Sequence, residues 1–309
     1  PSYEELFRLK SKDKELTDDV VEYLKNLRFT GDVYAIPYGT PIFPNEPVIT
    51  VRANIIEAML LETSILSIFN SSSIVATAAK RITTAAGNIP VMEFGARRSG
   101  NSIEASKCAY IAGCAGTSNV FTAKESNIPV MGTMAHCMIS SIGSDYEAFL
   151  MYAKSNPNNC VFLVDTFDTL KSGVPSAIKV AKDYLIPNGL KFKGIRIDSG
   201  DLAYLSKEAR KMLDAAGFTD TGICLSNGLN ETTIKSLIDQ GACINSLGVG
   251  DNISAPKELL GGVYKLVAIE EESKIIPKIK VSNDSIKTIN PGYKKVYRFF
   301  DKITNYYNL

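Results

Sequence analysis

The fold of this chain is decided by the stretch Gly194-Ile195-Arg196-Ile197-Asp198-Ser199-Gly200-Asp201. Arg196 and Asp198 alternate with two isoleucines, which predicts a strand with both charges on one face and the apolar side chains on the other. The Ser-Gly-Asp break predicts a turn, and apolar residues spaced by three and four predict a helix over 202–216 that stops at Gly217. Charged residues at the end of a strand and directly before a helix are typical of the catalytic edge of α/β folds.

Other stretches repeat this arrangement of a short apolar strand followed by polar or glycine-rich residues. They cover 89–94, 128–131, 160–164, 222–225 and 244–249. Most are followed by a helical pattern, and such alternation implies parallel strands joined by helical crossovers. With 194–197 these units favour an irregular α/β barrel, and an open α/β sheet is the alternative.

The two ends of the chain have a different character. We expect one or two helices over 3–28 with a cap at Thr17 or Asp18, and short edge strands and turns over the proline-rich segment 29–51. A long helix is predicted over 54–86, broken near 70–73, and antiparallel strands over 263–269, 275–281 and 295–300. We therefore expect a mixed α/β domain from 1–52 plus 265–309, in which the tail packs against 29–51. The barrel domain, 53–264, would carry the active site.

Composition narrows the class of protein. The 309 residues are 45% hydrophobic and 22% charged with a net charge of +1, which is typical of a globular protein that binds neither nucleic acid nor membranes. The apolar stretch 55–69 is interrupted by Glu57, Glu62 and Thr63, so we expect no membrane span. Six cysteines without a C-x-x-C pair predict free thiols in a reducing cytoplasm. With a single histidine, no four-ligand zinc spacing appears.

Cationic and imidazole side chains near the strand ends are the first candidates for chemistry. Arg97 and Arg98 present forked guanidinium groups that suit a carboxylate or phosphate, unless they are a solvated surface pair. Arg196 and Asp198 either belong to the same site or form a structural ion pair inside the barrel. His136 is either a general base or phosphate acceptor, or a packed or exposed residue without a task.

Carboxylates and glycine-rich turns complete the predicted rim. Asp165 and Asp168 follow another strand and are either Mg²⁺ ligands or helix N-caps. The turns at 226–228 and 248–251 can present backbone N–H groups to a phosphate, although neither is a Walker loop or a GxGxxG fingerprint. Cations, carboxylates, an imidazole and two glycine turns on one rim predict a phosphorylated, strongly anionic substrate.

An ordered series of motifs runs through residues 30–300. It consists of Glu93–Arg98, Gly116–Asn119, Gly132–His136, Val164–Thr166, Arg196–Asp201, Gly248–Gly250 and Pro291–Arg298. The series resembles the nicotinate phosphoribosyltransferase family. The resemblance implies a type II phosphoribosyltransferase fold, an irregular α/β barrel with a mixed α/β domain from both chain ends. It also implies phosphoribosyl transfer from 5-phosphoribosyl 1-diphosphate to nicotinate, with Mg²⁺ at the diphosphate, ATP as co-substrate, and a homodimer with shared sites.

The resemblance also implies a role for each matching residue. Phe94 would stack on the pyridine ring, while Arg97 and Arg196 would hold the nicotinate carboxylate and the substrate phosphates. Asp198 would contact the ribose hydroxyls or stabilise the ribosyl cation, and His136 would be phosphorylated by ATP. The implied substrate contacts also include Thr117, Ser118 and Asp165, and the 5-phosphate would be bound by Ser226, Asn227, Gly228, Gly248 and Gly250.

Departures from the family pattern leave alternatives open. The family's N-terminal segment, which supplies an aromatic residue to a neighbouring subunit, is expected to have no counterpart in residues 1–28. Asp251 and Asn252 stand where a small hydroxyl residue is expected. Ser118 stands where the nicotinamide-using relative carries Asp, which favours the acid as substrate. The alternatives are nicotinamide or quinolinate phosphoribosyltransferase, a non-catalytic phosphosugar-binding relative, and an unrelated barrel aldolase or isomerase.

Overall fold

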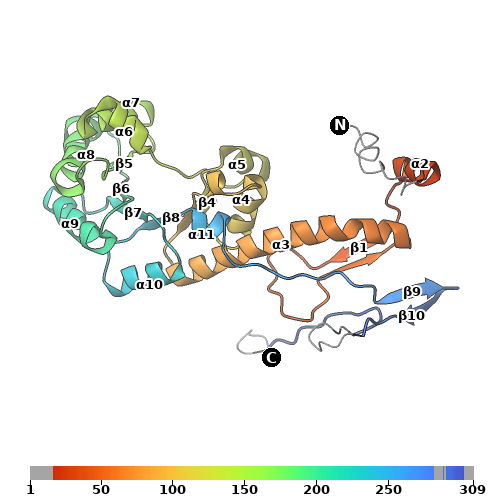
Figure 1. Cartoon of the computed structure of the whole chain (residues 1–309). Coiled ribbons are helices and arrows are strands. Elements are labelled where there is room, and N and C mark those ends of the chain that lie inside the picture. Colours follow the sequence, from red (N-terminus) through yellow and green to blue (C-terminus); the bar gives the residue numbers. More distant parts are fainter. Residues whose placement is uncertain (1–16, 282–287, 289, 303–309) are drawn as a thin grey trace. The chain divides into compact units, whose positions relative to one another are not determined.

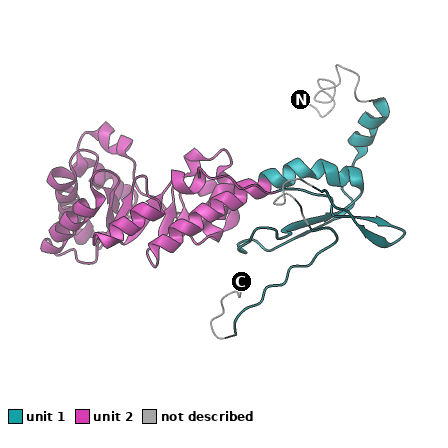
Figure 2. Cartoon of the chain, turned by 60° about the horizontal axis from the view of Figure 1, so that its bottom comes forward, with its two compact units in different colours: residues 1–67, 263–309 teal, residues 68–262 magenta. Residues whose placement is uncertain are grey.

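The computed structural model describes residues 17–281, 288 and 290–302, and these form two compact units. One unit contains residues 1–67 and 263–309, and the other contains residues 68–262 (Figure 2). The boundary on the N-terminal side lies inside the long helix α3, Ile55–Ala86. The domain boundaries expected at 52/53 and 264/265 stay a prediction.

The second unit is built on a six-stranded parallel sheet with the strand order β4-β3-β8-β7-β6-β5. The strands are β3 (Val91–Glu93), β4 (Gly116–Thr117), β5 (Val161–Leu163), β6 (Gly194–Ile197), β7 (Gly222–Ser226) and β8 (Ser246–Val249). β3 is the first strand of this sheet along the chain and pairs with β8, which is the last. The two edge strands are β4 and β5, so the strand order is that of a barrel with an open seam between β4 and β5. The expected α/β fold with parallel strands is confirmed.

The seam lies next to the segment 128–131, where we expected a full strand. In the structure only Val130 pairs, through a single bridge to Thr117 of β4. The expectation of a strand was wrong because Pro129 has no backbone N–H to donate to a ladder. Within the described part of the chain, no ladder joins this segment to β5.

Helices connect the strands and cover the outside of the sheet, as Figure 1 shows for α6 to α9. They are α4 (Ser102–Ile111), α5 (Val120–Ser126), α6 (His136–Ile142), α7 (Asp145–Ser155), α8 (Val174–Val180), α9 (Leu202–Ala215), α10 (Glu231–Asp239) and α11 (Asp251–Ser254), with short helical turns η2 (Ala96–Arg98), η3 (Thr169–Gly173), η4 (Ala181–Leu185) and η5 (Ile186–Asn188). α9 follows the sequence prediction. Asp201 caps it by accepting a hydrogen bond from the Tyr204 N–H, and Gly217 ends it at a φ of 91°.

The core of this unit lies between the sheet and the helices. Ile195 and Ile197 of β6 are fully buried, as the alternation in 194–198 predicts. Phe149 of α7 stacks on Phe162 of β5 with ring centroids 4.9 Å apart. The apolar faces of strand and helix thus hold the carboxyl ends of the strands in fixed positions.

Helix α3 is continuous, so the expected break near 70–73 is wrong. The polar side chains there find partners without interrupting the helix. Asn70 accepts a hydrogen bond from the Gly262 N–H at 3.0 Å, and the Thr77 hydroxyl donates to the Ser73 carbonyl at 2.7 Å. The apolar residues Val75 and Ile82 of α3 join the core. By length and composition alone α3 could cross a membrane, with a mean hydropathy of 1.3 and 6% of that stretch buried.

The first unit contains α2 (Asp18–Asn26) and two antiparallel hairpins. β1 (Asp32–Ala35) pairs with β2 (Ile49–Arg52), and β9 (Ala268–Glu271) pairs with β10 (Lys274–Pro277). The β9–β10 turn places Glu272 and Ser273 at positive φ, as a tight hairpin requires. Residues 295–300 form no strand of their own, in contrast to the expectation. The helix expected over 3–28 is seen as α2, and residues 3–16 lie outside the described part.

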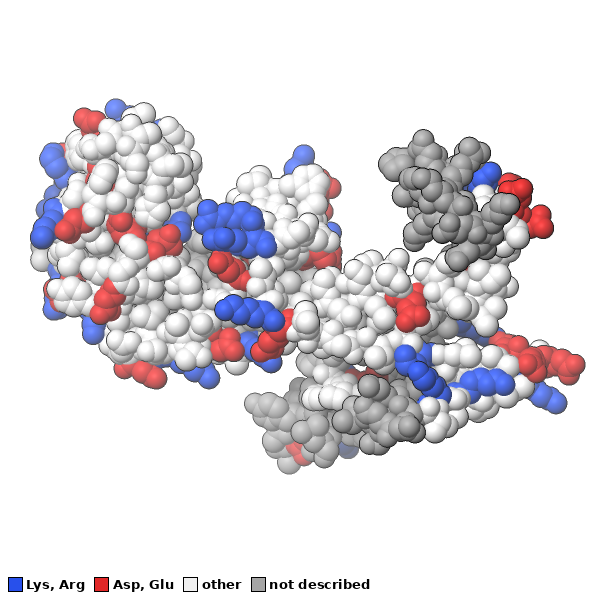
Figure 3. Space-filling model, in the orientation of Figure 1, with Lys and Arg blue, Asp and Glu red and all other residues white. Residues whose placement is uncertain are grey.

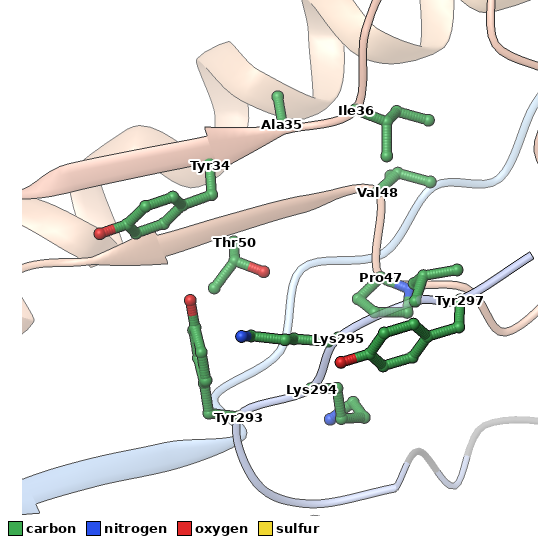
Figure 4. Close-up of a pocket in the computed structure, with 11 residues that line it drawn as sticks. Tyr34, Ala35, Ile36, Pro47, Val48, Thr50, Tyr293, Lys294, Lys295 and Tyr297 are labelled. Atoms are coloured by element: carbon green, nitrogen blue, oxygen red, sulfur yellow. The ribbon is translucent and has the colours of Figure 1, made fainter.

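The tail of the chain packs against residues 29–51, as predicted. Arg298 donates to Glu46 at 3.0 Å, and its guanidinium lies 5.8 Å from the centroid of the Phe43 ring. A pocket of about 320 Å³ lies between β1, β2 and residues 293–297. Tyr34, Tyr293 and Lys295 are among the side chains that line it (Figure 4).

Candidate active site

Polar side chains, an aromatic ring and glycine-rich turns gather at the carboxyl edge of the parallel sheet. In chain order they follow β3 (Phe94, Arg97), β4 (Ser118), the Val130 bridge (Thr133, His136), β5 (Asp165, Thr166), β6 (Asp198), β7 (Asn227, Gly228) and β8 (Gly250). Parallel strands end at the same edge, which explains why residues so distant in sequence meet there. On the face of this unit seen in Figure 3, acidic and basic side chains are intermixed.

Arg196 contacts three other side chains at this edge. Its Nε donates to the Ser226 hydroxyl at 2.8 Å, its Nη1 donates to the Thr133 hydroxyl at 3.1 Å, and its Nη2 lies 3.0 Å from Asp198 Oδ1. The Ser226 hydroxyl in turn donates to the same Asp198 oxygen at 2.5 Å. The structure therefore combines the two readings of Arg196 and Asp198, because they form an ion pair and also stand at the site.

Asp198 is held in its charged form by these contacts. Burial alone would raise the pKa of its carboxyl group, but the hydrogen bond from Ser226 and the charge of Arg196 outweigh burial, so its pKa lies below the ordinary value. The carboxylate keeps its second oxygen, Oδ2, directed toward His136 at 3.6 Å from Nε2. It is thus an anion at neutral pH with one oxygen available at the rim.

His136 begins helix α6 and lies between two carboxylates. Its Nε2 is 3.6 Å from Asp198 Oδ2 and 3.9 Å from Asp165 Oδ1, while its Nδ1 is 3.0 Å from the Thr166 hydroxyl. The two carboxylates favour a proton on Nε2, which leaves the lone pair on Nδ1 to accept a hydrogen bond from Thr166. Polar partners thus surround both ring nitrogens, so the ring is not simply packed.

Asp165 binds the residues after β6 with one carboxylate oxygen, and its other oxygen has no hydrogen-bond partner. Its Oδ2 accepts hydrogen bonds from the Asp198 N–H at 3.0 Å and from the Ser199 hydroxyl at 2.5 Å. Its side chain is 1% exposed, and Oδ1 is buried without a hydrogen-bond partner. Asp168, by contrast, caps η3 by accepting from the N–H groups of Leu170 and Lys171, which is the simpler of its two predicted roles.

Phe94 and the two arginines after it form the part of the edge that follows β3. The Arg196 guanidinium lies 5.3 Å from the centroid of the Phe94 ring, and Gly248 of β8 packs against the ring closely enough that a Cβ atom there would lie 2.6 Å from Phe94 Cδ2. Arg98 pairs with Asp251 at 3.1 Å. Arg97 is exposed and makes no hydrogen bond or ion pair with the described residues, so it is the guanidinium free for an anionic ligand.

The two glycine turns are linked to each other. Asn227 and Gly228 lie at φ angles of 100° and 57°, which exposes the turn after β7. Asn252 donates from its side chain to the carbonyls of Gly228 and Leu229 at 3.3 and 2.9 Å. Asn252, which departs from the family pattern, therefore fixes one turn against the other.

Three hydroxyl side chains have roles that the sequence did not predict. Ser226 is buried and serves Arg196 and Asp198, so the structure does not support its hydroxyl as a phosphate ligand. Thr117 is fully buried and its hydroxyl donates to Glu93, whereas Ser118 is exposed. Thr133 was not among the predicted site residues, although it lies in the Gly132–His136 motif, and in the structure it accepts a hydrogen bond from Arg196.

Comparison with known proteins agrees with this geometry. The model of the nicotinate phosphoribosyltransferase (NAPRTase) family matches residues 89–298, and the model of the NAPRTase N-terminal domain matches residues 2–70. The second match corrects the expectation that residues 1–28 have no counterpart in the family. The signal was missed because these residues carry none of the motifs that identify the barrel.

Individual relatives point the same way. A nicotinate phosphoribosyltransferase of Bacillus subtilis is 46% identical over 92% of this chain and 64% of its own length, and pncB2 of Mycobacterium tuberculosis is 40% identical over 92% of this chain and 60% of its own length. This chain thus spans less than two thirds of the length of these relatives.

Solved structures also resemble the chain. A nicotinate-nucleotide pyrophosphorylase from Pyrococcus furiosus has a TM-score of 0.72 at 29% identity, covering 94% of this chain and 71% of its own. Human nicotinic acid phosphoribosyltransferase has a TM-score of 0.72 at 25% identity, covering 81% and 61%. Because the family model covers more than two thirds of the sequence, and the strand ends carry the family's motifs in order, the chain belongs to the nicotinate phosphoribosyltransferase family.

Proposed function

We propose that this protein transfers the 5-phosphoribosyl group of 5-phosphoribosyl 1-diphosphate to nicotinate, giving nicotinate mononucleotide and diphosphate for NAD biosynthesis. The observation that carries the proposal is the Arg196–Asp198–Ser226 cluster beside the Phe94 ring, with the free Arg97 guanidinium on the same turn. Flat aromatic surface, cation and carboxylate are the groups that a pyridine acid and a ribosyl cation need.

In the proposed transfer, the pyridine nitrogen attacks C1 of the ribose as the bond from C1 to the diphosphate oxygen breaks. The electron pair of that bond leaves with diphosphate, and positive charge develops on the ribose carbon. Asp198 is an anion with one oxygen at the rim, and it stabilises this charge. Arg97 and Arg196 hold the nicotinate carboxylate and the phosphates, and Phe94 stacks on the pyridine ring.

The preference for nicotinate rests on charge. A carboxylate gains charge-assisted hydrogen bonds from guanidinium groups that the neutral amide of nicotinamide does not gain. Arg97 has no competing carboxylate among the described residues, so it can serve this purpose. Nicotinamide transfer is the second candidate, and the exposed Ser118, in place of an acidic residue, speaks against it.

ATP coupling is proposed to pass through His136. Once the Thr166 hydroxyl turns away from Nδ1, this nitrogen would attack the γ-phosphorus of ATP as the bond to the bridging oxygen breaks, and ADP leaves with the electron pair. Water later attacks the phosphorus, the N–P bond breaks with its electron pair returning to Nδ1, and inorganic phosphate is released. The carboxylates of Asp165 and Asp198 beside Nε2 support the assignment, because they hold the proton on that nitrogen and stabilise the charge that the ring gains.

Mg²⁺ is proposed as the cofactor at the diphosphate. Asp165 fits this role, since its buried Oδ1 has no hydrogen-bond partner, and Asp198 Oδ2 faces the same space around His136. In the described segments no three His, Cys, Asp or Glu side chains cluster as a metal site, so substrate phosphates would supply the other oxygens. The ion, when bound, would neutralise charge on the leaving diphosphate.

We further propose a homodimer that shares its sites between subunits and works in the cytoplasm. Large apolar side chains on α3 are exposed, including Met59 at 68% and Ile68 at 63%, and a partner subunit would cover them. All six cysteines are free thiols, as expected in a reducing compartment. Sizing of the purified protein tests the first point, and an active monomer would refute it.

The decisive experiment measures diphosphate release with 5-phosphoribosyl 1-diphosphate and Mg²⁺. Nicotinate, nicotinamide and quinolinate are compared, each with and without ATP. We expect diphosphate release with nicotinate and not with the other two acceptors, and we expect ATP to stimulate it. Release with nicotinamide or quinolinate instead would replace the proposed substrate, and no release with any acceptor would favour a non-catalytic phosphosugar-binding protein.

His136→Ala separates coupling from transfer. The variant is expected to keep basal diphosphate release and to lose its stimulation by ATP, because the acceptor of the phosphoryl group is gone. Incubation with γ-labelled ATP should label the wild type and not the variant. Unchanged stimulation in His136→Ala would remove the histidine from the mechanism.

A further inference from the structure

Glu93, the last residue of β3, is a fully buried carboxylate that accepts four hydrogen bonds. Its Oε1 accepts from the Gly95 N–H and from the Ser254 hydroxyl at 3.0 Å. Its Oε2 accepts from the Ser106 hydroxyl at 2.9 Å and from the Thr117 hydroxyl at 2.6 Å. The donors belong to the turn after β3 and to α11, α4 and β4, so one side chain joins separate elements at the catalytic edge.

These donors are all neutral groups. Burial of a carboxylate is costly, but an apolar side chain of similar volume would leave four buried donors without an acceptor, which is also costly. The hydrogen bonds therefore offset the burial of the carboxylate, and their directions fix the geometry. A network in which each oxygen has two directed donors permits one arrangement of the surrounding elements.

We propose that Glu93 is a positioning residue, which fixes the turn carrying Phe94 and Arg97 against the rest of the edge. The turn is closely packed, because a Cβ atom on Gly95 would lie only 2.6 Å from the Gly250 carbonyl oxygen. Phe94 follows Glu93 directly, and its N–H donates to the Val249 carbonyl at 2.8 Å. Glu93 thus sets the place of the pyridine-stacking ring without touching a substrate.

The same anchor reaches the loop after β4. The Thr117 hydroxyl donates to Glu93 and accepts a hydrogen bond from the Asn119 N–H at 2.9 Å. Ser118, between them, is exposed at the rim, and its N–H donates to the Glu93 carbonyl at 2.9 Å. Side chain and backbone of Glu93 therefore hold both walls of the proposed nicotinate subsite.

Glu93→Gln is the informative substitution because it keeps the shape and halves the number of accepting oxygens. The rotatable hydroxyls of Ser106 and Thr117 can turn to accept from the new amide group, but a backbone N–H cannot. The Gln variant should thus fold and loosen the turn only in part. Glu93→Leu removes every acceptor and should loosen it fully. Glu57→Gln is the matched control, since Glu57 is a buried carboxylate of the other unit that also accepts from an N–H and a hydroxyl, both of Thr30.

The kinetic test rests on the proposed function. For Glu93→Gln, kcat/KM for nicotinate should fall about 10-fold, mainly through KM, as expected for a weakened charge-assisted hydrogen bond. The KM for 5-phosphoribosyl 1-diphosphate should stay within about twofold of wild type, a change much smaller than the 10-fold loss expected for nicotinate. The loss should be larger for Glu93→Leu, and Glu57→Gln should behave as wild type. Equal losses for both substrates, or wild-type kinetics in Glu93→Gln, would overturn the proposal.

A second readout needs no activity. Phe94–Gly95 is the sole Phe–Gly pair in the sequence, so labelling Phe with ¹³C at the carbonyl and Gly with ¹⁵N isolates the Gly95 amide signal in a triple-resonance spectrum. The amide proton, bonded to a carboxylate in the wild type, should move upfield in Glu93→Gln and stay in place in Glu57→Gln. An unmoved signal in Glu93→Gln refutes the anchor. A moved signal in a protein inactive on nicotinate would refute the proposed function and retain the anchor.

Discussion

Replacing Gly248 by Ala should displace the Phe94 ring and damage nicotinate use. An added Cβ would lie 2.6 Å from Phe94 Cδ2 and still closer to Phe94 Cε2, whereas ordinary contact begins at 3.4 Å, so the ring must move by more than 0.8 Å. Gly248 is buried in β8 between paired strands, so the strand itself cannot yield as easily as the ring.

The expected size of the effect follows from that displacement. Misplacing a positioning group by about 1 Å costs roughly 100-fold in rate, so kcat/KM for nicotinate should fall by about that factor. Overpacking of this kind costs about 1–3 kcal/mol of stability, which lowers the melting temperature by several degrees. The ring would remain present but would no longer stack on the pyridine plane in register with the ribose carbon.

The assay compares diphosphate release at varied nicotinate and at varied 5-phosphoribosyl 1-diphosphate. Gly261→Ala is the control, since a Cβ atom there meets nothing within 4 Å. The variant should lose nicotinate kcat/KM while the control keeps it. Wild-type nicotinate kinetics in Gly248→Ala would show that the Phe94 ring does not contact the acceptor, and the reasoning would fail.

Further substitutions test the charges at the edge. Ser226→Ala removes a hydrogen bond that lowers the pKa of Asp198, so the acid limb of the pH profile of kcat/KM should move to higher pH, and an unmoved limb would contradict the role of Ser226. Burial, which outweighs the hydrogen bond from Ser172, raises the pKa of Asp145, so ionisation of Asp145 costs stability as pH rises above its ordinary value near 3.8. Asp145→Asn should therefore gain in melting temperature relative to wild type between pH 4 and pH 7, and a relative loss would contradict the burial argument. Arg97→Gln should raise the KM for nicotinate about 10-fold or more, whereas the paired Arg98, changed in the same way, should have a smaller effect, and the reverse order would reassign the carboxylate site.

The parts of the fold that follow local rules were predictable. The alternation in 194–198 and the cap at Asp201 set strand β6 and helix α9, because both depend on residues within a few positions. The meeting of Arg196, Asp198 and His136 was predictable as well, since strand ends of a parallel sheet converge.

Features that depend on distant partners were not predictable. The continuity of α3 depends on an Asn70 partner, Gly262, that is 192 residues away. The role of Ser226 depends on register across the sheet, which places its hydroxyl between Arg196 and Asp198 and not in the exposed turn. Glu93 opens the Glu93–Arg98 motif, but its role could not be predicted, because three of its donors are hydroxyl groups of Ser106, Thr117 and Ser254, up to 161 residues away.

The open seam of the sheet has a consequence for motion. The Val130 bridge consists of two backbone hydrogen bonds to Thr117, and side chains of Asn159 and Arg196 donate to Gly132 and Thr133, so a few bonds hold this wall where ladders hold the others. Few bonds need to break for this segment to open, so the free energy of local opening should lie below that of global unfolding. Backbone amides of 131–135 should therefore exchange with deuterium well before those of β6. His136 stands at the end of this segment, so the imidazole belongs to the part of the wall that can open while Arg196 and Asp198 stay in place.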